Sequence, residues 1–293
     1  MKLTKLTLIP FLFILFFATS CGSQTPTTPT ATPTATLTPT ATQPPMAISI
    51  NAVGVSMEEY QSELVRLQQA QTQLGTSSTP EEQKQKVVDD FTNQLLLEQG
   101  AIQGGFTLND SALQARIDQL ASQMGGLDKL TAWEAANNYT PDTFREAMRR
   151  SIAVAWQRDQ IVNSVPTTAD QVHARQILVQ TEETANDLLA QIKAGADFAT
   201  LALTYDPVTG GDLGWFPQGY LTQPEVEAAA FALQPGQTSE IIKSAIGYHI
   251  VYVIERDPQH ELTPDARRVL QEKKLSEWLD AAKAASQIVI NVP

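Results

Sequence analysis

The residues best suited to chemistry lie between positions 172 and 256. His249 stands in the segment GYHIV, and Asp206 precedes the glycine-rich segment GGDLGWF of residues 210–216. An imidazole and a carboxylate can both form hydrogen bonds to a bound group whose charge distribution changes during a reaction. The surrounding stretch is largely apolar, so it combines a few polar groups with the material for an apolar pocket.

A small α/β domain is predicted to position these residues. Apolar residues at helical spacing between 182 and 193 stop just before Gly195, a residue type that often ends helices. The other predicted elements follow the same rules of spacing and of Gly or Pro at element ends. They are a strand over 176–179, helices over 182–193, 197–204 and 224–233, a glycine-rich turn over 210–216, and strands over 241–242 and 250–254.

Four motifs in this stretch resemble, in their order, the parvulin family of peptidyl-prolyl cis-trans isomerases. They are ARQILV at 174–179, GGDLGWF at 210–216, FALQPG at 231–236 and GYHIV at 247–251. The resemblance implies catalysis of rotation about X-Pro peptide bonds, whose barrier is ~18–20 kcal/mol. Because no bond is made or broken, we expect no cofactor and no metal. The catalyst has to bind the twisted amide better than either planar form.

The resemblance also implies site residues. It makes His249 one member of the family's histidine pair, whereas Gln176 stands where the second histidine is usual. Gln176 keeps hydrogen-bonding capacity but cannot titrate. Asp206 matches the family's polar group opposite the proline, although an Asp-Pro turn explains it equally well. The pocket around the proline ring is expected to involve Leu221, Val226 and Phe231, with Ser244 near a position that often carries a small hydroxyl residue.

Several nearby residues have structural explanations instead. His173 falls on the opposite strand face from Gln176, so we expect it, like His260, to be a surface histidine. Asp212 is expected to stabilise its own turn. For Phe231, plain core packing is at least as good an explanation as a substrate pocket.

Two functions are compatible with these residues. The first is an active isomerase that assists the folding of secreted proteins, which His249 and the GGDLGWF turn favour. The second is a binding-only chaperone whose parvulin module has lost rate enhancement, which Gln176 favours. We adopt the first. A solute-binding lipoprotein is a more distant alternative, because it would need two large α/β lobes. The loop QTEE at 180–183 would repel phosphate, so no preference for phosphopeptides is expected.

The N-terminus resembles a bacterial lipoprotein signal over residues 1–20. Two lysines precede an apolar run that is too short for a membrane span. Small residues then lead to Cys21 as in a lipobox, which implies lipid attachment there and location in the cell envelope outside the cytoplasmic membrane. The alternative is a plain secretory signal with an incidental cysteine. Residues 21–45 are rich in Thr and Pro and predict an extended tether to the membrane.

Residues 46–165 are predicted to form a mainly helical domain. One strand is expected over 47–55, and helix starts are marked by Ser56, Thr79 and Thr140, of which the last two are followed by proline. The region contains no histidine or cysteine, and most of its carboxylates lie in first helical turns. By its position it resembles the chaperone domain that precedes the parvulin module in foldases of the PrsA and SurA kind.

The C-terminal residues are predicted to complete that helical domain. The isomerase-like domain occupies 166–258, and residues 259–293 contain a long helix and a terminal strand. We expect the strand over 288–292 to pair with residues 48–53. The predicted fold class is therefore α+β, with a small α/β domain inserted into a discontinuous, mainly helical domain.

The charge composition of the chain bears on which binding partners can be expected. The chain has 293 residues and a formal net charge of −12. Nucleic acid is excluded as an expected partner because neutralising phosphates requires clustered Lys and Arg. The resemblance to the parvulins, rather than the composition, implies unfolded polypeptides with X-Pro bonds as the substrates. The single cysteine rules out a disulfide within the chain.

Overall fold

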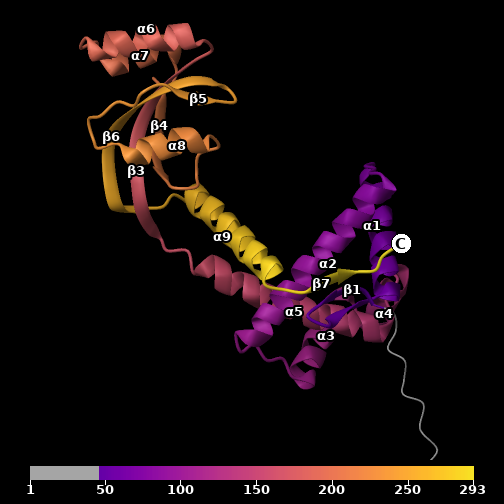
Figure 1. The fold of residues 1–293 in the computed structure, drawn as a ribbon. Helices are drawn as coiled ribbons and strands as arrows, with labels where there is room; N and C mark the ends of the chain where they lie inside the picture. The colour runs from indigo at the N-terminus through magenta and orange to yellow at the C-terminus, as the bar shows by residue number, and fades with distance from the viewer. Residues whose placement is uncertain (1–45) are drawn as a thin grey trace, which may run out of the picture. The chain divides into compact units, whose positions relative to one another are not determined.

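The computed structural model describes residues 46–293, and Figure 1 shows the arrangement of their helices and strands. The predicted signal peptide, Cys21 and the tether lie outside the described residues. Within the described part, no helix has the length and apolar character needed to cross a membrane.

Five helices make up most of the first half of the described chain. Helix α2 (Pro80–Gln103) begins with a capping box in which Thr79 and Glu82 exchange hydrogen bonds, and Thr140 caps α5 (Pro141–Asn163) in the same way with Thr143. Both helices carry proline in their first turn, as the sequence predicts. The five are α1 (Met57–Leu74), α2 (Pro80–Gln103), α3 (Asp110–Met124), α4 (Leu127–Ala136) and α5 (Pro141–Asn163).

A three-stranded antiparallel sheet joins the two ends of the described chain. Its order is β2 (Val53–Ser56), β1 (Met46–Ile50) and β7 (Ile288–Ile290). Ile48 lies opposite Ile290 and Ile50 opposite Ile288, so the predicted pairing of the terminal strand is confirmed. Helix α9 (Pro264–Ala284) packs against α2 and α5, and its Trp278 adds to the same core as Phe91.

The prediction of one strand over 47–55 was wrong. The chain turns at Asn51 and Ala52, which have φ angles of 52° and 68°, and returns as β2. Two consecutive residues with positive φ produce a tight hairpin turn whose twist suits the flanking strands. Sequence alternation alone did not reveal this turn, because alanine is an unusual residue at such a position.

The α/β region has a four-stranded antiparallel sheet in the order β4-β3-β6-β5. Strands β3 and β6 are longer than predicted, and residues 212–217 form a strand where only a turn was expected. The sheet contains β3 (Thr168–Val179), β4 (Asp212–Pro217), β5 (Ile242–Ser244) and β6 (Gly247–Glu261), and its helices are α6 (Glu182–Lys193), α7 (Phe198–Tyr205) and α8 (Pro224–Ala232).

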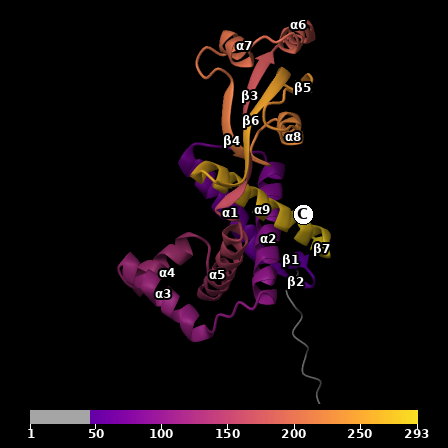
Figure 2. The ribbon, with the colours of Figure 1, turned by 90° about the vertical axis from the view of Figure 1, so that its left-hand side faces the viewer.

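The two faces of this sheet carry separate apolar cores. Ile177 and Ile250 belong to the core with α6 and α7, whereas Ala174 and Val251 belong to the core with α8. Figure 2 shows α8 alongside β5 and β6. Because side chains alternate along a strand, Gln176 and His249 lie on the α8 face. This face therefore positions the candidate site.

Candidate functional site

Three residues from three strands form a hydrogen-bonded chain around His249. The imidazole Nδ1 lies 2.8 Å from Gln176 Oε1, and Nε2 lies 2.7 Å from Ser244 Oγ. The carbonyl oxygen of Gln176 can only accept, so Nδ1 carries the proton and the Ser244 hydroxyl donates to Nε2. His249 has an exposed fraction of 0%. The structure therefore brings together three residues that the sequence assigned to the site.

The environment of His249 favours its neutral form. Burial lowers the pKa of the imidazole, and the Glu225 carboxylate opposes this shift as the weaker influence. A neutral imidazole with one donor and one acceptor nitrogen matches the two partners that it has. The ring thus holds the Gln176 amide in one orientation, with the oxygen toward His249 and the NH₂ group directed elsewhere.

Asp206 ends α7 and forms hydrogen bonds within its own turn. Its carboxylate accepts from the backbone N–H groups of Val208 and Thr209, each at 3.1 Å, and from the Thr209 hydroxyl. The Thr209 hydroxyl is the main reason that the pKa of Asp206 is lowered. These contacts agree with the turn explanation for this residue.

Asp206 nevertheless lies near Gln176, because both line one cavity of about 260 Å³. The sequence did not single out the helix residues on its wall. Tyr205 was detectable only through its position next to Asp206. The full lining consists of Gln176, Ile177, Leu178, Ala202, Tyr205, Asp206 and Gly211.

The expected apolar residues gather against one core but do not line that cavity. Leu221, Val226 and Phe231 all pack in the cluster around Phe216, on the α8 face. Phe231 meets Phe216 edge to face at 6.0 Å. Val226 is only 2% exposed, as a core residue would be. The contact of these residues with a substrate remains a prediction.

His173 and His260, which were expected at the surface, are half-buried, and their side chains are 23% and 32% exposed. The ring of His260 stacks on that of Trp215 with 4.1 Å between their centroids, and the ring of His173 lies tilted at 5.6 Å from the Trp215 ring. His173 Nε2 also lies 2.9 Å from the Asp212 carboxylate, which accepts from the Gly214 N–H at 2.8 Å. Asp212 therefore stabilises its own turn as predicted, and His173 does not join His249.

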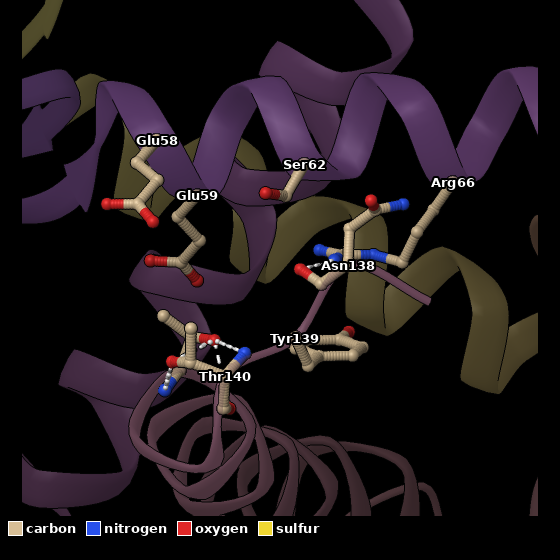
Figure 3. Close-up of a pocket in the computed structure, with 8 residues that line it drawn as sticks. Glu58, Glu59, Ser62, Arg66, Asn138, Tyr139 and Thr140 are labelled. Atoms are coloured by element: carbon tan, nitrogen blue, oxygen red, sulfur yellow. Dashed lines mark hydrogen bonds between the residues drawn. The ribbon is translucent and has the colours of Figure 1, made fainter. Parts of the chain in front are cut away.

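A second, smaller cavity lies in the helical part between α1 and the α4–α5 loop (Figure 3). The Arg66 guanidinium lies 4.0 Å from the centre of the Tyr139 ring and donates to the carbonyl of Asn137 at 3.1 Å. The cavity volume is about 20 Å³, which suits a single water rather than a peptide. These contacts fasten the loop to α1, so the cavity is structural.

The donor groups present do not point to a metal. Across residues 46–293, no group of three or more His, Cys, Asp or Glu side chains is placed to hold one.

Comparison with known proteins gives two family matches that together span almost the whole chain. Residues 2–158 match the SurA-like N-terminal domain, and residues 160–257 match the PPIC-type PPIase domain. The chain belongs to the SurA-like family and carries a PPIC-type isomerase domain. The α+β fold of a helical part with a small α/β part agrees with this pair of domains.

Curated relatives match over shorter regions. A foldase protein PrsA of a Geobacillus species is 38% identical over 122 residues, which are 40% of this chain and 44% of that protein. The chaperone SurA of Burkholderia thailandensis is 34% identical over 144 residues, covering 42% of this chain and 32% of that protein. In two further foldase proteins PrsA, the matched region is 28% and 56% of the protein's own length.

Among solved structures, PrsA from Bacillus cereus is similar over 86% of this chain and 95% of that chain. The TM-score is 0.46 and the identity is 18%.

Proposed function

We propose that the protein is a peptidyl-prolyl cis-trans isomerase that acts as a foldase on unfolded polypeptides. The observation that carries the proposal is the chain Gln176–His249–Ser244 beside the cavity that Gln176 shares with Asp206. The PPIC-type domain and the relatives named foldase support the same function. The parts of the site come from an inserted α/β region, and the domain limits 46–165, 166–258 and 259–293 remain part of the proposal.

The chemistry requires selective binding of a twisted amide. Twisting the X-Pro bond removes conjugation and localises the lone pair on the prolyl nitrogen. A hydrogen-bond donor held near that nitrogen stabilises the twisted form more than the planar forms. In our proposal Gln176 supplies this donor through its Nε2 group, because His249 holds Oε1. Leu221 and Phe231, with the buried Val226 packed behind them, provide the apolar surface for the proline ring, and Asp206 borders the cavity.

A proline-isomerisation assay on residues 46–293 tests this proposal. We expect the protein to accelerate cis-to-trans conversion of a proline peptide, and His249→Ala to reduce kcat/KM by about tenfold, a loss of about 1.4 kcal/mol. Gln176→His is expected to retain activity, because an imidazole can also pair with His249. Gln259→Ala, at an exposed position far along β6 from His249, serves as the control and is expected to match the unmodified protein.

Gln176 also favours a second candidate, a binding-only chaperone. That function requires no acceleration by the unmodified protein, recovery of activity in Gln176→His, and suppression of aggregation of an unfolded protein. This combination of results would replace the first proposal with the second.

The partners and location belong to the same proposal. Lipid attachment at Cys21 would place the protein at the membrane, outside the cytoplasm, where it meets secreted chains. Membrane fractionation of the full chain and of Cys21→Ser tests this, since only the former should stay with the membrane. An equal distribution of both would exclude the anchor.

Phosphopeptides are not expected to be preferred. Thr181 caps α6, and Glu182 and Glu183 are exposed in its first turn. Their charge opposes a bound phosphate. Titration with a Ser-Pro peptide and its phosphorylated form should give weaker or equal binding of the latter. Tighter binding of the phosphorylated peptide would contradict the expectation.

A further inference from the structure

One carboxylate holds the backbone of the loop between β4 and α8. Glu227 Oε1 accepts from the Gly219 N–H at 2.5 Å, and Oε2 accepts from the N–H groups of Tyr220 and Leu221 at 2.9 and 3.0 Å. Glu227 lies in α8, six to eight residues beyond the groups it binds. Three consecutive backbone donors thus converge on a single half-buried side chain.

Such an arrangement depends on a carboxylate. Its two oxygens only accept hydrogen bonds and have room for several donors, and bonds to an ionised acceptor are stronger than neutral ones. An amide at this position would present one NH₂ group to N–H donors and satisfy fewer of them. The loop has no other cap of this kind at the helix start, because the Gln223 N-cap residue makes no side-chain cap bond.

The backbone segment that Glu227 binds, residues 219–221, ends in Leu221. The side chain of Leu221 connects this segment to the apolar cluster. Leu221 packs in the same cluster as Phe231 and Phe216, on the face of the sheet that carries His249. The N–H that Gly219 donates to Glu227 belongs to a residue with a φ of 90°. Glycine adopts this backbone conformation more readily than other residues. The position of Leu221 is therefore fixed from two sides, by its apolar neighbours and by Glu227.

We propose that Glu227 is a positioning residue, which acts by holding the Gly219–Leu221 backbone and thereby places Leu221 against the proline ring. This inference rests on the proposed function of the α/β region. Glu227 itself does not touch the substrate. Glu227 affects activity through the position of Leu221. A residue that only stabilises the fold would not act through Leu221.

A double-mutant cycle on the full chain tests the inference. Glu227→Ala should reduce kcat/KM for a proline peptide by roughly 10-fold, because a misplacement of about 1 Å can cost up to about 100-fold. Leu221→Ala should reduce it by a similar factor. If Glu227 acts through Leu221, the double variant should lose little more than Leu221→Ala alone. Losses that multiply in full would show an independent, structural role and overturn the inference.

Conservative variants and a control keep the result interpretable. Glu227→Gln, which retains one acceptor oxygen, should lie between Glu227→Ala and the unmodified protein. Glu183→Ala removes an exposed carboxylate from α6 and should leave kcat/KM unchanged. Thermal unfolding of each variant shows whether it is folded at the assay temperature. If Glu227→Ala does not fold, Glu227→Gln replaces it in the cycle.

Binding of a proline peptide, followed by NMR shifts of the Leu221 methyl groups, separates this inference from the proposed function. If the unmodified protein binds the peptide without accelerating isomerisation, the catalytic proposal fails. The positioning role would then still predict weaker peptide binding by Glu227→Ala and Glu227→Gln. Unchanged peptide affinity and unchanged Leu221 shifts in both variants would overturn the role of Glu227 alone.

Discussion

Gln176 Oε1 lies 2.8 Å from His249 Nδ1 at a position where the histidine is completely buried. The pair joins neighbouring strands β3 and β6, on which Gln176 is opposite Val251. A residue that cannot titrate therefore fixes the tautomer of one that can, and Ser244 completes the arrangement from β5.

Gln176→Leu should destabilise the protein despite its apolar side chain. The change leaves the Nδ1–H group of His249 buried without its acceptor, which costs about 1–3 kcal/mol. Urea unfolding measures this loss as a lower midpoint. Gln180→Leu provides the control, because Gln180 is exposed just beyond the same strand and should change the unfolding free energy by less than about 0.5 kcal/mol. Equal effects of the two changes would contradict the proposed geometry.

The lowered pKa of His249 should make stability depend on pH in a defined direction. The folded state resists protonation, whereas the unfolded chain takes up a proton near the ordinary value of 6.5. The unfolded state therefore binds more protons as the pH falls below about 6.5, and the unfolding free energy decreases there until the folded imidazole also protonates. Above that pH both states are neutral, and this contribution to stability is fully present.

Unfolding curves between pH 5 and 8 measure this dependence, with His249→Gln as the matched variant. Glu225, Gln176 and Ser244 remain in the variant, so the part of the pH dependence that disappears belongs to His249. An unchanged pH dependence in His249→Gln would show that other groups cause it.

Arg150→Met should destabilise the helical part strongly. The Arg150 side chain is 9% exposed and lies 2.6 Å from Glu59 and 3.5 Å from Glu98, which are 18% and 20% exposed. Removing one partner from a buried ion pair costs about 3–5 kcal/mol. The exposed Arg158, in the same helix, is the control, and Arg158→Met should change the unfolding free energy by less than about 0.5 kcal/mol.

The loss in Arg150→Met should be smaller at pH 5 than at pH 8. Burial raises the pKa of Glu98, and Arg150 opposes this shift. Without Arg150 the carboxylate protonates more readily as the pH falls, which removes part of the unpaired charge. Chemical denaturation at both pH values makes the comparison, and an identical loss at each would argue against an unpaired Glu98.

Ile288→Ala should weaken the sheet that joins the chain ends. Ile288 packs against the core cluster of β1 and α2, whereas its neighbour Val289 is 39% exposed. Because Ile288 is only partly buried, we expect its truncation to lower the free energy of unfolding by about 2 kcal/mol, the low end of the range for such changes. Val289→Ala should cost less than about 0.5 kcal/mol. Thermal unfolding of residues 46–293 distinguishes the two variants. Equal melting temperatures of Ile288→Ala and Val289→Ala would contradict the importance of this packing.

Much of the local structure was predictable from sequence because its causes are local. Thr79-Pro80 and Thr140-Pro141 mark helix starts through hydrogen bonds to residues three positions away. Residues 182–193 formed the predicted helix with the predicted bounds, since apolar spacing and a following glycine specify it. Alternation of Ile288 and Ile290 was enough to predict the terminal strand.

The site required the tertiary structure because its contacts are not local. Gln176 and His249 are separated by 73 positions, and only the register of β3 against β6 brings their side chains within hydrogen-bonding distance. Glu227 gave no signal in the sequence, since an acidic residue early in a helix is ordinary. The sequence by itself determined the family motifs and most helices. The folded chain decided which polar groups meet, because strand register and helix packing set distances that residue spacing does not encode.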